Sequence, residues 1–276
     1  MIKRVGNYGA EAGLIAAAMV TSVFGFWNIY FGAEADAQPH HHFHFATAFM
    51  WMCLLLAQLI LIARRSYKMH RVVGLAVLIA GPMLVATTAM LSVRSAHEGV
   101  VSGDGDFMIV QNVMATVELG VLIFLAFLLK KRRQLHGSLL LSTIILFMGI
   151  ALFFAIITFV PQFRIEGPET FYRFQMAAIT AQTISLAVGF LFFMRDRRNG
   201  WPFLVAGLSY FFNEAIRSLL TSFGLIDPLT EIVGSMSQPL TFIATFALLL
   251  SLLAATALPR RARTQGGAGE TARSGA

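Results

Sequence analysis

"HFHFATAFMWMCLLLAQLILIARRSYKMHRVVGLAVLIAGPMLVATTAM" occupies residues 42–90 and decides the fold. It holds two long apolar runs, separated by the basic segment "RRSYKMHR" at residues 64–71. A helix of about 20 apolar residues is long enough to cross the hydrocarbon core of a bilayer. We therefore expect two membrane-spanning helices joined by a charged turn.

The same pattern extends along the whole chain of 276 residues. Hydrophobic residues make up 57% and charged residues only 13%, about half the charged share of a soluble domain. The runs are continuous and do not alternate with period two, so helices are expected and a β-barrel is not. Eight spans are predicted, at residues 10–32, 43–63, 72–93, 109–129, 138–160, 174–194, 202–222 and 232–258. The expected fold class is an all-α polytopic membrane bundle, with a membrane domain over 1–259 and a disordered cytoplasmic tail over 260–276.

Lysine and arginine residues concentrate in every second loop. The segments "RRSYKMHR", "KKRRQLHG" and "RDRRNG" follow the second, fourth and sixth spans, and "PRRAR" follows the last. Cytoplasmic loops carry such an excess, so both termini are expected in the cytoplasm of a bacterial inner membrane. In an alternative interpretation, the first apolar stretch and "GAEADAQ" at 32–38 form a cleaved signal peptide, which would leave seven spans.

The basic loops also indicate an internal repeat. His70 and His136 end two of these loops in the same way, and "RDRRNG" follows at nearly the same interval without a histidine. Spans two to seven are then either three related hairpins, or evenly spaced spans that produce such a period by themselves.

Residues 42–90 and "KKRRQLHGSLLLSTI" resemble a pattern in poorly characterised bacterial multi-span membrane proteins. In that pattern a histidine pair opens one span, a glutamine follows within it, and His-Arg-x-x-Gly opens the next span. The matching positions are His42, His44, Gln58, His70, Arg71, Gly74 and, in the second hairpin, His136. The resemblance implies seven or eight helices and no settled activity. A weaker similarity to haem-oxidase assembly proteins and b-type membrane cytochromes rests on histidines at helix ends, although such cytochromes usually hold their axial histidines deeper in the bilayer.

The outer histidines are the first candidate site. The candidate metal ligands are His40, His41, His42, His44 and His97. Imidazole binds copper, zinc and iron, and Glu98 beside His97 in the next outer loop could complete a coordination shell. A helix would place His40 and His44 on one face, whereas an extended strand would pair His42 with His44. Alternatively, these are solvated loop residues that bind metal only transiently.

The inner histidines are the second candidate site. His70 and His136 could bind one haem, or haem propionates and lipid phosphates together with the neighbouring basic residues. Alternatively, they are interfacial residues in loops that hold topology and anionic lipid. His44 and His70 flank a span of about 39 Å at 1.5 Å per residue, so no single metal can join them.

Charged residues inside apolar runs form the third candidate site. The candidate ion or proton path comprises Glu118, Glu214, Arg217, Gln58 and Gln182. An ionised side chain at the bilayer centre costs at least about 2.5–3.5 kcal/mol, so it normally faces protein or water and finds a partner. Glu118 and Glu214 could share Arg217 in one cluster. Such a cluster serves either a transport path or an interhelical clamp of about 1 kcal/mol.

These features support two main hypotheses and exclude few others. The first is a membrane protein holding haem b, copper or iron, in electron transfer or in assembly of a respiratory metal centre, with a respiratory complex as partner. The second is a proton-coupled transporter for a small solute, and a membrane scaffold for another protein is a further alternative. Basic residues form no single face, so nucleic acid is not an expected partner. The sequence contains no phosphate-binding glycine loop, H-E-x-x-H or nucleophile elbow, and enzymatic activity stays open. Trp27, Trp51 and Trp201 are expected to anchor the chain at membrane interfaces.

Overall fold

The computed structural model describes residues 8–33 and 35–257, and all its regular secondary structure in those ranges is helical. The α-helices are α1 Gly9–Gly25, α2 Pro39–Ala63, α3 Tyr67–Ser102, α4 Ile109–Leu128, α5 Arg133–Phe159, α6 Tyr172–Arg195, α7 Trp201–Ser222, α8 Ile226–Gly234 and α9 Gln238–Ala257. A π-helical turn, Trp27–Phe31, follows α1, and two 3-10 turns, Pro161–Phe163 and Pro168–Thr170, precede α6. The expected tail over 260–276 lies outside the described residues.

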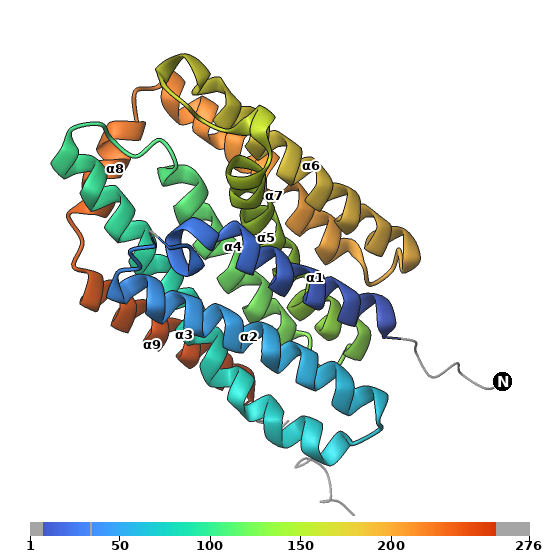
Figure 1. The fold of residues 1–276 in the computed structure, drawn as a ribbon. Coiled ribbons are helices and arrows are strands. Elements are labelled where there is room, and N and C mark those ends of the chain that lie inside the picture. Colours follow the sequence, from blue (N-terminus) through green and yellow to red (C-terminus); the bar gives the residue numbers. More distant parts are fainter. Residues whose placement is uncertain (1–7, 34, 258–276) are drawn as a thin grey trace, which may run out of the picture.

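The long helices run up and down in one bundle (Figure 1). Helix α1 packs against α5, α2 against α3, α3 against α9, and α6 against α7. Three turns, at residues 64–66, 129–132 and 196–200, lie at one end, which we call the basic end. The opposite end contains the start of α2 and the short helix α8, and we call it the histidine end.

Six helical segments of the described chain are long and apolar enough to cross a membrane: α2, α3, α4, α5, Pro168–Arg195 and α9. Helix α1 has only 17 residues, and α7 carries Glu214 and Arg217 in its second half. The all-helical, multi-pass membrane fold is thus confirmed. The count of eight spans and the hairpin repeat stay predictions.

Two boundaries differ from the sequence prediction. Helix α3 has 36 residues and continues past residue 93 to Ser102, because its C-cap is Gly103 in the left-handed conformation at φ 79°. His97 and Glu98, which were expected in a loop, therefore lie in the last turns of α3. The last predicted span, 232–258, begins later as α9 with Gln238 and Pro239, because the short helix α8 occupies most of the predicted loop before it and ends at Gly234.

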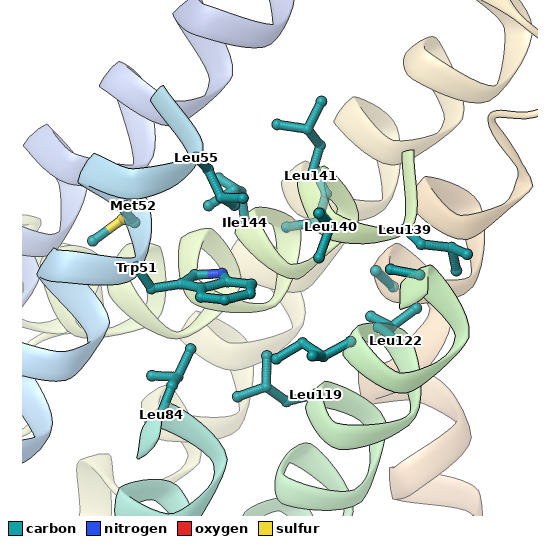
Figure 2. Close-up of a cluster of buried hydrophobic side chains, with 14 of the residues drawn as sticks. Trp51, Met52, Leu55, Leu84, Leu119, Leu122, Leu139, Leu140, Leu141 and Ile144 are labelled. Carbon is teal, nitrogen blue, oxygen red and sulfur yellow. The ribbon is translucent and has the colours of Figure 1, made fainter. Parts of the chain in front are cut away.

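The largest core cluster surrounds Trp51 of α2 (Figure 2). The Trp51 side chain is 0% exposed, and Leu84 of α3 and Ile144 of α5 belong to the same cluster. Its indole Nε1 donates a hydrogen bond to Thr143 Oγ1 at 3.0 Å. The expectation that Trp51 anchors the chain at a membrane interface is therefore wrong: a buried tryptophan needs a polar partner for its N–H, and Thr143 supplies it.

Candidate functional site

A cavity of about 740 Å³ lies between α1–α7 in the half of the bundle next to the histidine end. Residues 40–52 of α2, 88–98 of α3, 111–119 of α4 and 209–217 of α7 contribute to its lining. Its volume falls in the range of sites that bind small organic molecules. We call it the central cavity.

The outer histidines do not share one site. Because α2 is helical from Pro39 onward, His40, His41 and His44 all reach the central cavity. His42 lies on another face, where its Nδ1 is 2.5 Å from the Tyr30 hydroxyl. His97 lines a separate hollow of about 510 Å³, and its Nδ1 lies 3.2 Å from the Gly234 carbonyl oxygen. Within residues 8–33 and 35–257, no group of three His, Cys, Asp or Glu side chains could hold a metal ion.

His44 is oriented by threonines on two helices. Its Nδ1 lies 3.2 Å from Thr87 Oγ1, and Thr87 is also 2.9 Å from Thr47 Oγ1. The Thr87 hydroxyl donates to the Leu84 carbonyl, so the His44 ring nitrogen is assigned as the donor to Thr87. That tautomer leaves Nε2 of His44 as an acceptor for an occupant of the central cavity.

Two ion pairs occupy the cavity wall. Arg217 Nη2 lies 2.7 Å from Glu214 Oε2, and Gln111 of α4 donates to Glu214 Oε1 at 2.9 Å. Arg94 and Glu98 of α3 pair at 2.6 Å. Both arginines that line the cavity are therefore already paired with a carboxylate.

Glu118 stands apart from these pairs. No ion pair joins Glu118 to Arg217 in the described part of the chain, so the Glu–Arg–Glu cluster that the sequence allowed does not form. Asn213 and Ser209 of α7 lie within hydrogen-bonding reach of the Glu118 carboxyl group instead. Asn213 is only 2% exposed, and its Oδ1 has no hydrogen-bond partner among the described residues.

The two glutamines expected beside these charges separate. Gln182 of α6 lines the central cavity, whereas Gln58 of α2 lies nearer the basic end and does not. Gln58 is 7% exposed, and neither Oε1 nor Nε2 has a partner in the described ranges. A Cβ added to Gly74 of α3 would lie 3.8 Å from Gln58 Nε2.

The inner histidines lie at the basic end, away from the central cavity. His136 Nδ1 is 2.7 Å from the Ala126 carbonyl oxygen. His70 is close enough to His136 for their charges to interact, and its buried Nδ1 has no partner in the described structure. The structure thus places these two side chains near each other, and their role as a cofactor site stays a prediction.

Sequence reasoning did not single out several residues of the site. Thr87, Ser209 and Tyr210 were read as parts of apolar runs, and Arg94 as a loop residue. Hydroxyl groups give no sequence signal, because they commonly bond their own helix. Arg94 did carry a sequence signal, because it is among the few basic residues at the histidine end.

No protein-family model, curated protein or solved structure matches this chain.

Proposed function

We propose that the protein binds a small organic solute in the central cavity and carries it across the membrane as a transporter. The observation that carries this proposal is the cavity itself, about 740 Å³ in volume and lined by ionisable residues from membrane-embedded helices. Ionisable residues inside such helices are costly and typically mark a substrate or ion pathway.

The lining suits an amphipathic solute. Aromatic side chains from α2, α5 and α6 line much of the cavity: Phe45, Phe49, Phe147, Phe153 and Phe174. Polar side chains of α4 and α7 line another part: Gln111, Glu118, Asn213, Glu214 and Arg217. Small-molecule sites combine a mostly apolar wall with a few placed polar groups in this way. A solute with an apolar body and one polar group fits both.

Buried polar groups also indicate a route for the solute from the cavity toward the basic end. The cavity lining comes only from the histidine-end half, so passage requires opening of the other half. In that other half, Gln58 and His70 both hold buried polar atoms without partners in the described chain. Buried polar groups normally bind protein or ordered water, so these atoms are candidates for a hydrated path. Glu118, which pairs with no cation in residues 8–33 and 35–257, is the candidate carrier of a coupled proton.

The test is to fill the cavity. Ala115 of α4 lines it, whereas Val117, two residues further along, is 50% exposed on the outside of the bundle. Proteoliposomes with the wild-type chain, Ala115→Trp or Val117→Trp are assayed for uptake of radiolabelled 2-phenylethylamine, 2-phenylethanol and 3-phenylpropanoate. We expect protein-dependent uptake of at least one probe, abolished by Ala115→Trp and retained by Val117→Trp. Uptake of none of the three, or equal uptake by both variants, contradicts the proposal.

A haem or metal role is the second candidate, and the His44 geometry favours it. Metal-binding histidines usually hold one ring nitrogen in a hydrogen bond and present the other to the metal. In His44, Nδ1 is held in this way by Thr87. Haem b, which a single axial histidine can hold, would then bind from the cavity side. An absorbance spectrum and a metal assay of detergent-purified protein test this role. A Soret band or stoichiometric metal that Thr87→Val diminishes would support it, and the lack of both would contradict it.

A further inference from the structure

The charges around the central cavity do not balance. Three carboxyl groups line it, and two of them are paired: Glu98 with Arg94 at 2.6 Å and Glu214 with Arg217 at 2.7 Å. Among the described residues, Glu118 has no basic partner, and its neighbours Asn213 and Ser209 are uncharged. The lining thus offers one carboxyl group that no cation among the described residues neutralises.

Ser209 beside Glu118 is an acceptor as well. Its Oγ donates its single proton to the Ala206 carbonyl at 2.8 Å, so its lone pairs remain for a donor. Asn213 lies within hydrogen-bonding reach of Glu118 and is only 2% exposed, with its Oδ1 closed off from the cavity.

We propose that the cavity selects a protonated amine, whose ammonium group binds Glu118 and Ser209 and whose apolar body lies against the phenylalanine wall. The proposal rests on the proposed function and names the substrate class of that same site. An ammonium group carries three donors and no acceptor, which complements a carboxylate and a hydroxyl lone pair. Phe147 and Phe153 are available for the apolar body and for cation–π contact.

Competing solute classes fit this part of the cavity less well. A carboxylate would meet Glu118 without a free arginine, since Arg94 and Arg217 are both paired. A neutral alcohol of the same shape could donate one hydrogen bond but brings no positive charge, so Glu118 would have to bind a proton for the site to be neutral.

The test compares binding of three matched probes to detergent-purified full-length protein: 2-phenylethylamine, 2-phenylethanol and 3-phenylpropanoate at pH 7. We expect the amine to bind at least about tenfold more tightly than the alcohol or the acid. Glu118→Gln keeps the shape of the side chain and should lower amine affinity at least about tenfold while leaving alcohol affinity within about twofold. The control is Glu231→Gln on α8, where the side chain is exposed and outside the cavity lining; it should leave all three affinities unchanged.

The outcomes separate the two proposals. If the alcohol or acid binds as tightly as the amine and Ala115→Trp blocks that binding, the cavity is a solute site and the amine preference is wrong. If the amine is preferred equally by wild type and Glu118→Gln, the assigned residue is wrong and the inference fails. If none of the probes binds, both the inference and the proposed function are contradicted. Loss of binding in Glu118→Gln counts only if its alcohol affinity shows that the cavity is still folded.

Discussion

Arg217 and Glu214 lie one turn apart on α7 and pair at 2.7 Å, with Gln111 of α4 bonded to the same carboxylate. The pair is partly open to the central cavity, since its side chains are 34% and 25% exposed. The hydrogen bond from Gln111 to Glu214 thus joins α4 to α7 at the wall of the proposed solute site.

Replacing Arg217 with leucine tests whether this pair is functional or structural. A partly exposed ion pair contributes about 0–1 kcal/mol, and interhelical polar contacts in membranes contribute about the same. We expect Arg217→Leu to lower the free energy of unfolding by no more than about 1 kcal/mol while uptake of the transported probe falls at least about tenfold. Unfolding in detergent and proteoliposome uptake measure the two effects. A variant that fails to fold would show that the pair is structural and holds Glu214 in place for its hydrogen bond with Gln111 of α4.

Trp51 should contribute far more to stability than any residue of the cavity wall. Its side chain is fully buried, so Trp51→Ala is expected to cost about 3–5 kcal/mol. Thr143→Val keeps the shape but leaves the indole N–H unpaired, and should cost about 1–3 kcal/mol. Trp27 is 39% exposed, so Trp27→Ala serves as the control and should change stability by less than about 1 kcal/mol. Equal losses at positions 27 and 51 would contradict this assignment of the core.

The same tryptophan shows where sequence reasoning succeeded and failed. Continuous apolar runs and basic loops gave the helical membrane fold and most helix positions, because bilayer thickness and backbone hydrogen bonding allow few alternatives. They did not show which side of a helix faces protein, since lipid and core are both apolar. Trp51 was therefore expected at an interface and lies in the core.

The packing of neighbouring helices also determines which residues line the candidate site. Arg94 and His97 are three residues apart on α3, yet they line different hollows. The sequence placed both near the histidine end and could not separate them, because the direction of each side chain depends on neighbouring helices. The sequence prediction ended this span at residue 93, where the apolar run ends. Helix α3 continues beyond that run to Ser102, so its polar last turns were expected to form a loop.

Close packing of α1 on α5 gives a matched pair of glycine variants. A methyl group on Gly25 would overlap the backbone carbonyl oxygen of Ala151, whereas one on Gly13 would meet nothing within 4 Å. Small residues let membrane helices approach closely, so Gly25→Ala must separate α1 from α5. We expect Gly25→Ala to destabilise the protein by about 1–3 kcal/mol. Gly13→Ala should be neutral or stabilising by up to about 1 kcal/mol, as alanine favours helix. Unfolding in detergent compares them, and equal stability of both variants would contradict the α1–α5 contact.

The orientation of the bundle decides from which side a solute enters the central cavity. Lysine and arginine lie mainly at the basic end, so that end is expected in the cytoplasm and the cavity is expected to receive solute from outside. An alkaline phosphatase reporter fused after residue 68 should be inactive, and one fused after residue 105 should be active, because the enzyme works only when exported. Expression of both fusions is measured by immunoblot as the control. Activity after residue 68 and none after residue 105 would invert the bundle. The cavity would then receive its solute from the cytoplasm, and the proposed direction of transport would change from uptake to export.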